Sequence, residues 1–173
     1  MDINCTDRQP CDSTVAAWTR LLRAQRCTLV SVERALKDEG FPPLEWYDVL
    51  LELERGGPLR PRDLQSRLLL AQSNLSRLLD RMEAAGAVER LSCKEDARGQ
   101  LVRLTASGKE LRTRMWRVYA RAIQQVIGAR LNGQEAATLA DLLGRLSGCS
   151  PPEQGPAKAL PSEVDSAIGA PLA

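Results

Sequence analysis

The side chains best suited to specific recognition lie in one short polar run near the middle of the chain. From 72 to 81 the sequence reads QSNLSRLLDR. Asn and Arg can each make two hydrogen bonds to a base edge, and short serines let a helix backbone approach the bases closely. We therefore expect this run to read DNA in the major groove. The residues assigned to this face are Gln72, Ser73, Asn74, Ser76, Arg77 and Arg81, the last of these for a phosphate.

A second charged group follows at 93–99, in the segment CKEDARG. Lys94 and Arg98 would suit phosphates or an A·T-rich minor groove, where the negative potential is enhanced. Asp96 could hold a tight turn by accepting hydrogen bonds from backbone N–H groups. We expect Lys94 and Arg98 to add DNA contacts from the tip of a hairpin. A solvated hairpin tip beside an ordinary exposed helix face is the alternative.

The elements that must position these residues are two helices and two strands. The pattern predicts helices over 61–68 and 72–85 and short strands over 88–92 and 100–104. Gly86 suits the end of the second helix, where a left-handed residue is usual. Because two short strands are marginal alone, the hairpin must pack on the helices. The apolar residues that turn the second helix toward the core are Leu75, Leu78, Leu79 and Met82. This order predicts a winged helix-turn-helix.

Longer helices flank this segment. Apolar residues at three- and four-residue spacing predict helices over 13–38, 44–55 and 106–131, and a last helix follows Gly133. Ser13 would cap the first of them. The helix over 106–131 is apolar on two sides, which predicts one partner in its own chain and one in a second chain. The expected fold is mostly α with a small two- or three-stranded wing and an intertwined helical dimerisation region.

These elements predict four regions. Residues 1–12 form a mobile N-terminal segment, and the Pro-rich residues 148–173 form a disordered tail. The winged helix-turn-helix occupies 44–105. The helical dimerisation region combines 13–43 with 106–147.

The charge distribution agrees with a phosphate-binding face. From Arg60 to Arg121 there are 14 Lys and Arg against 7 Asp and Glu, although the whole chain has a formal charge of only +2. A concentration of positive charge is expected where a protein meets nucleic acid. The acidic start has no apolar signal core, and no apolar run is long enough to span a membrane, so we expect a cytoplasmic protein.

The same composition argues against an enzyme. The chain has no histidine, and its five cysteines show no CxxC spacing. No nucleophile with an adjacent base and no phosphate-cradling glycine loop is evident. We expect no cofactor, no metal and reduced thiols. A winged-helix module that binds protein without reading DNA is the remaining alternative; it would not need Asn74, Arg77 and a basic wing together.

The region from Trp18 to Leu146 resembles the MarR family of winged helix-turn-helix transcription regulators. The resemblance rests on WYDVLLELE, on the two central helices and on VERLSCKEDARGQLVRLTASGKEL. The chain departs from the family pattern at Leu69, Ala71 and Ala97, which predicts weaker or differently tuned DNA binding. The resemblance implies a homodimer that binds double-stranded DNA at a pseudo-palindromic operator, usually as a repressor. It also implies release by a small anionic or phenolic effector or by cysteine oxidation.

The resemblance also implies which residues would bind such an effector or sense oxidation. In a urate-responsive branch, an acid of the second helix and two arginines take part, and the matching positions here are Asp48, Arg77 and Arg90. The alternative for Asp48 is a structural carboxylate that pairs locally. Cys93, beside Lys94, is the candidate for oxidation, because a sensing cysteine needs an accessible thiolate.

Overall fold

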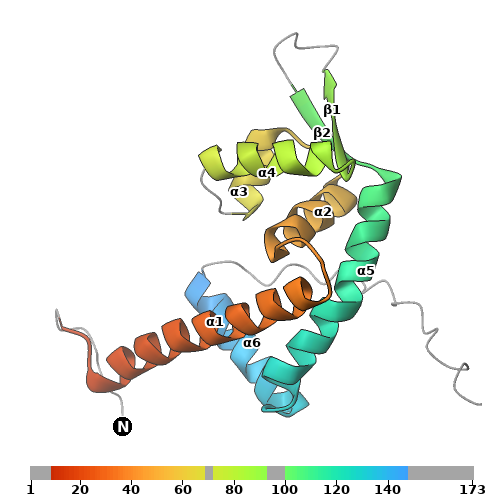
Figure 1. The fold of residues 1–173 in the computed structure, drawn as a ribbon. Helices are drawn as coiled ribbons and strands as arrows, with labels where there is room; N and C mark the ends of the chain where they lie inside the picture. The colour runs from red at the N-terminus through yellow and green to blue at the C-terminus, as the bar shows by residue number, and fades with distance from the viewer. Residues whose placement is uncertain (1–8, 69–71, 93–99, 148–173) are drawn as a thin grey trace, which may run out of the picture. The chain divides into compact units, whose positions relative to one another are not determined.

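The computed structural model describes residues 9–68, 72–92 and 100–147 and divides the chain after Ala129 into two compact units. The first unit contains α1 (Asp12–Asp38), α2 (Leu44–Gly56), α3 (Pro61–Leu68), α4 (Gln72–Ala84), β1 (Val88–Ser92), β2 (Gln100–Leu104) and α5 (Ala106–Ile123), which continues as the π-helical turn η1 (Gln124–Gly128). The second unit contains α6 (Gly133–Ser147). The predicted, mostly helical fold with a small wing is confirmed (Figure 1).

The central helices and strands form a winged helix-turn-helix. Helix α3 packs against α4, and α4 packs against β1, as the upper part of Figure 1 shows. Strands β1 and β2 are antiparallel, with Val88 opposite Leu104 and Ser92 opposite Gln100. The predicted bounds of α3 and of both strands are confirmed, and α4 ends one residue earlier than predicted.

The wing has two strands, and a single residue outside them pairs with β2 on its other side. Leu59, just before α3, forms an isolated antiparallel bridge with Val102 of β2. Its N–H donates to the Val102 carbonyl at 3.0 Å, and the Val102 N–H donates back to the Leu59 carbonyl at 2.8 Å. Both residues are buried, so this bridge closes the hairpin over the core. These two hydrogen bonds satisfy the buried backbone N–H and carbonyl groups of Val102.

The core of the first unit lies where α2, α4, the hairpin and α5 meet. Trp46 and Tyr47 of α2 are both buried. Tyr47 stacks on Trp116 and meets Tyr119 edge-on, with ring centroids 6.0 and 5.2 Å apart. The largest fully buried side chains are Leu36, Leu50, Leu53, Leu64, Leu78, Leu79, Met82, Met115, Val49 and Val102. Because few aromatic residues are present, aliphatic side chains supply most of the buried apolar area.

Helix α5 differs from the single two-sided helix that the sequence predicted. It ends at Ile123, and the chain continues through a π-helical turn to Gly128. Trp116 and Tyr119, from one of the two predicted apolar sides, pack against the core of the same chain. Part of this side of α5 is therefore covered inside the first unit, and a contact of α5 with a second chain stays a prediction.

Among the described residues of the first unit, the exposed large apolar side chains lie on α1. The predicted stripe divides in two: Val32 and Leu36 are buried, whereas Trp18 is 61% and Leu22 48% exposed. The predicted Ser13 cap is wrong, because α1 begins at Asp12 and its N-cap position is Cys11, which makes no side-chain capping bond. One extra helical residue places Ser13 inside the first turn, where its hydroxyl meets the Cys11 sulfur at 3.0 Å.

In the second unit, α6 begins with a reciprocal cap. The Glu135 N–H donates to the Asn132 side chain at 3.0 Å, and the Asn132 N–H donates to the Glu135 carboxylate at 2.9 Å. This capping box satisfies two backbone donors at once. The larger apolar side chains of α6 are exposed, namely Leu139, Leu142, Leu143 and Leu146. No helix in the described ranges is both long and apolar enough to cross a membrane.

Candidate nucleic-acid interface

Helix α4 separates an apolar face from a polar one, as its spacing predicted. Its core side chains, Leu75, Leu78, Leu79 and Met82, are all at most 3% exposed. The opposite face presents Asn74, Ser76, Arg77 and Arg81, which are all exposed. Gln72 and Ser73 form the first residues of α4, but their side chains lie outside the described part of the structure. The buried leucines pack α4 against the core, so its polar edge faces outward and can enter the major groove of DNA.

Several arginines of the basic segment are paired with acidic neighbours. Arg67 pairs with Glu52 at 3.3 Å, and Arg103 pairs with Glu89 at 2.8 Å. Arg112, at the start of α5, pairs with Glu54 at 2.6 Å. The net charge of this segment therefore overstates the charge that is available to a phosphate backbone.

Arg77 and Arg81 are different. Neither forms an ion pair with any residue in the ranges that the structure describes. Both side chains project from the exposed edge of α4. An unpaired, exposed guanidinium can bind a phosphate or the O6 and N7 atoms of guanine without first breaking an internal contact. The geometry thus favours the two arginines that the sequence analysis placed on this face.

The predicted tip contacts Lys94 and Arg98 fall outside the described residues, as does Cys93. The structure does describe the base of the hairpin, which lies against α4. A hairpin leaving this base starts beside the recognition helix. The assignment of Lys94 and Arg98 to DNA and of Cys93 to oxidation stays a prediction.

The three residues carried over as a ligand set have separate surroundings. Arg90 lies on β1 and binds two carboxylates of α4, Asp80 and Glu83. Arg77 is on the exposed face of the same helix. Asp48 lies on α2, where the charged groups that shift its pKa are all acidic and include neither arginine. The binding of one ligand by all three side chains stays a prediction.

Asp48 has an unusual environment of its own. Burial raises its pKa from 3.8 to about 6, and the neighbouring carboxylates of Glu33, Glu45 and Glu52 add to the effect. Glu33 of α1 has a structural task, because its carboxylate accepts a hydrogen bond from the Leu44 N–H at the start of α2. Asp48 is thus a carboxyl group whose ionisation opposes folding near neutral pH.

Replacing Asp48 with asparagine is expected to stabilise the protein at pH 8. The folded state holds the Asp48 proton more tightly than the unfolded chain, so the carboxyl group favours folding at low pH and loses that contribution as the pH rises from about 4 to above 6. The full shift corresponds to about 3 kcal/mol. Because the side chain is partly exposed, we expect a gain of about 1–2 kcal/mol at pH 8 and little change at pH 4.

Urea denaturation at the two pH values measures this difference. Glu110→Gln, at an exposed position of α5, is the matched control and should change stability by less than about 0.5 kcal/mol at both. Equal stability of Asp48→Asn and the original protein at pH 8 would contradict the assigned environment.

Two features of this region were not predicted from the sequence. One is the pairing of Arg90 with Asp80 and Glu83, for which the sequence carries no periodic signal because β1 and α4 meet only in the folded chain. The other is the joint at Thr105, whose hydroxyl donates to the Gly86 carbonyl at 2.6 Å and accepts from the Gly108 N–H at 3.0 Å. Its signal is visible in the sequence as a capping residue three positions before a glycine.

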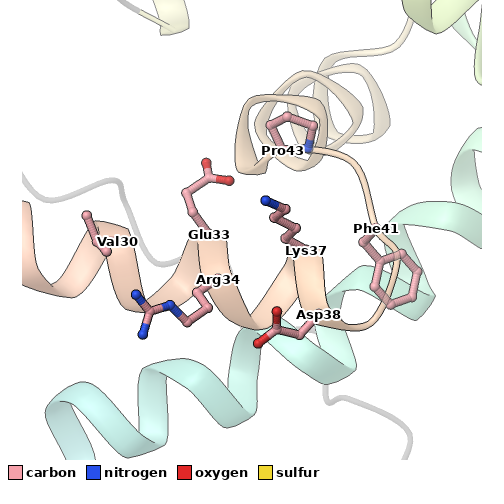
Figure 2. Close-up of a pocket in the computed structure, with 7 residues that line it drawn as sticks. All are labelled: Val30, Glu33, Arg34, Lys37, Asp38, Phe41 and Pro43. Atoms are coloured by element: carbon pink, nitrogen blue, oxygen red, sulfur yellow. The ribbon is translucent and has the colours of Figure 1, made fainter.

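Within the described ranges, two cavities lie near these elements. The larger, of about 400 Å³, is lined where α1 turns into α2, with Glu33 and Lys37 extending toward Pro43 and Phe41 beside it (Figure 2). The smaller, of about 200 Å³, lies between α3, α4 and the hairpin. Its polar lining residues are Arg62, Gln65, Ser76, Arg90 and Gln100. The smaller cavity therefore adjoins the face proposed to read DNA.

A recognition helix with an exposed polar edge, backed by a short helix and flanked by a two-stranded wing, defines a DNA-binding protein of the winged helix-turn-helix class. The MarR family model matches residues 39–99. The multiple antibiotic resistance protein MarR of Escherichia coli K12 is 31% identical over 115 residues, which are 64% of this chain and 80% of that protein. The chain therefore belongs to the MarR family and is a transcription regulator.

Solved structures agree with this assignment. The MarR family regulator Sco3205 of Streptomyces coelicolor, solved in complex with DNA, is 25% identical with a TM-score of 0.74, covering 87% of this chain and 96% of its own. Wild-type MarR of E. coli in its apo form is 26% identical with a TM-score of 0.63, covering 74% of this chain and 94% of its own. Family members regulate transcription and are not enzymes.

Proposed function

We propose that the protein is a homodimeric repressor that reads a pseudo-palindromic operator through α4. The observation that carries the proposal is the exposed edge of α4, where Asn74, Ser76 and Arg77 stand clear of the core and Arg77 has no ion pair with a described residue. Gln72, Ser73, Lys94 and Arg98 complete the proposed contacts. Two-fold symmetry would place half-sites about one helical turn apart, roughly 34–36 Å.

A fluorescence-anisotropy titration of the upstream DNA of the protein's own gene tests this function. We expect tight binding that weakens steeply between low and moderate salt, because each neutralised phosphate contributes about −0.9 to the slope of log K against log salt. Weak binding to this and to every other genomic duplex would favour a winged-helix module that binds protein instead.

The proposed dimer is supported by the unpartnered apolar surface of α1. Trp18, Leu22 and Val15 are 61, 48 and 46% exposed and lie on one side of the helix. Stable dimers usually bury about 1,200–2,000 Å² in total, which a 27-residue helix of roughly 40 Å can supply in part. The exposed leucines of α6 offer a further apolar surface, which we assign to the same region.

Trp18→Asp is expected to convert the dimer into a monomer. It removes the largest exposed apolar side chain of α1 and would place an unpaired carboxylate in the interface, which raises the dimer dissociation constant by more than about 100-fold. Sedimentation velocity measures the change. Ala24→Asp introduces the same carboxylate on the opposite side of α1 and should remain dimeric; a Trp18→Asp variant that is still dimeric at low micromolar concentration would refute the α1 interface.

We further propose that a small anionic or phenolic effector, or cysteine oxidation, releases the protein from DNA. Arg90 and Arg62 line the cavity beside Ser76, so an anion bound there would compete with DNA for this face. Asp48 and Arg77 remain candidates for the same role, and Cys93 remains the candidate for oxidation. An effector acts only through its differential affinity for the two states. Complexes that survive both millimolar benzoate and peroxide would argue against either signal.

A further inference from the structure

The side chain of Arg90 connects the wing to the recognition helix. Arg90 lies in the middle of β1, opposite Val102, and reaches back across α4. Its Nη2 atom lies 2.5 Å from the Asp80 carboxylate, and its Nη1 atom lies 2.5 Å from the Glu83 carboxylate. The Arg90 backbone N–H also donates to Glu83, at 3.2 Å. One strand residue therefore holds two residues of α4 through three contacts.

The geometry of these contacts restricts α4 in more than one direction. A planar guanidinium that binds two carboxylates through different nitrogens fixes both the distance and the rotation of its partners. Asp80 and Glu83 are three residues apart and so lie on the same side of the helix. The Arg90 side chain is 25% exposed, and the side chains of Asp80 and Glu83 are 58% and 38% exposed, so water reaches part of both ion pairs. Rotation of α4 about its own axis would break at least one of these ion pairs.

The ion pairs of Arg90 with Asp80 and Glu83 also determine the charge next to Arg77. Asp80 follows Arg77 by three residues, a spacing at which opposite charges on a helix attract each other. In the structure Asp80 is bound by Arg90, and Arg77 has no ion pair with a described residue. Without Arg90, Asp80 and Glu83 would stand unneutralised on the helix that faces DNA, and Asp80 would be free to bind Arg77.

We propose that Arg90 is a specificity-determining positioning residue: by binding Asp80 and Glu83 it orients α4 on the wing and leaves Arg77 free to read bases. This inference rests on the proposed function, in which α4 reads the operator. Arg90 itself touches no base in this scheme. Its loss should therefore reduce selectivity for the operator and leave the number of phosphate contacts unchanged.

The test compares Arg90→Gln with Arg103→Gln, a matched control. Arg103 lies on the same hairpin and pairs with Glu89 of β1, so each variant removes one positive charge and one arginine ion-pair site from the wing. Affinities for the operator and for an unrelated duplex are measured by anisotropy at several salt concentrations. We expect Arg90→Gln to lower the ratio of the two affinities at least tenfold with an unchanged salt slope. Arg103→Gln should change the ratio less than about twofold.

Two more variants separate orientation and charge from a general loss of folding. Arg90→Lys keeps the charge but cannot bridge both carboxylates in the same way, so it should also lose selectivity while retaining the thermal midpoint within a few degrees. Adding Asp80→Asn to Arg90→Gln removes the carboxylate that would capture Arg77 and should restore part of the ratio.

Other outcomes overturn the proposal. If Arg90→Gln reduces the salt slope by about one unit and leaves the ratio of operator to non-operator affinity unchanged, Arg90 binds a phosphate directly. Full selectivity in Arg90→Lys would show that charge alone suffices. Failure of the unmodified protein to discriminate the two duplexes would instead refute the proposed function itself, before any variant is compared.

Discussion

Arg77→Ala is expected to weaken binding to the operator by about 5- to 150-fold while leaving affinity for unrelated DNA nearly unchanged. The range corresponds to the roughly 1–3 kcal/mol that a bidentate contact to a base contributes to discrimination. Arg77 is exposed and has no ion pair with a described residue, so its truncation removes no internal contact and should not alter the thermal midpoint. The measurement is the same anisotropy titration with two duplexes.

Arg81→Ala is the control for this experiment. Arg81 lies on the same exposed edge of α4, one turn further along, and is assigned to a phosphate. Its loss should weaken binding to both duplexes by similar factors and reduce the salt slope by about one unit. Similar behaviour of the two variants would mean that Arg77 also binds only the backbone and that base reading lies elsewhere on the protein.

Gly108→Ala should strongly destabilise the protein. A β-carbon at Gly108 would lie 2.0 Å from the Ala87 carbonyl oxygen and 2.9 Å from a methyl carbon of Leu104. The carbonyl cannot easily retreat, because it accepts hydrogen bonds from the Thr105 hydroxyl at 3.0 Å and from the Thr105 N–H at 3.3 Å. We expect a loss of about 2–4 kcal/mol in the free energy of unfolding.

Urea denaturation with Gly133→Ala as the control tests this prediction. Gly133 also lies at the start of a helix, but no atom lies within 4 Å of its added β-carbon, so alanine should be tolerated there. A Gly108→Ala variant as stable as the Gly133→Ala variant would show that α5 does not approach the turn after α4 as closely as described. Because Gly108 joins α5 to that turn, the destabilised variant should also bind operator DNA more weakly.

The hydrogen bonds of Thr105 connect the start of α5 to the residues that follow α4. Thr105 caps α5 and donates hydrogen bonds to the carbonyls of Gly86 and Ala87, two and three residues after the end of α4. Ser107 adds a bond to the Gly86 carbonyl at 3.1 Å. A displacement of α5 would therefore be transmitted to the end of the recognition helix through short hydrogen bonds and one close backbone contact.

The local elements of the winged region followed from the sequence alone. Leu75, Leu78 and Met82 recur at helical spacing, and Gly86 takes the positive φ of 70° that ends a helix. The strands were equally clear, since each lies between strong turn signals. These features depend on neighbours within a few residues, so periodicity and turn chemistry suffice to predict them. The exposed edge of α4, and hence Arg77 as the first candidate for base reading, followed from the same periodicity.

Contacts between elements were decided only by the tertiary structure. The sequence carries no signal that Arg90 binds Asp80 and Glu83, because an ion pair between a strand and a helix depends on how the two are placed in space. The same holds for the predicted ligand set of Asp48, Arg77 and Arg90, because whether residues of α2, α4 and β1 meet around one ligand depends on how these elements are placed in space.

The partner surface shows the same division. Both apolar sides of α5 were evident from the sequence, but helical spacing does not reveal whether a side packs on its own chain or on another. The aromatic contacts of Tyr47 with Trp116 and Tyr119 cover part of one apolar side of α5 within the chain. The apolar side chains near the start of α1, in contrast, are exposed. Hydrophobic burial is non-directional, so the pattern determined which residues leave water, and three-dimensional packing determined what covers them.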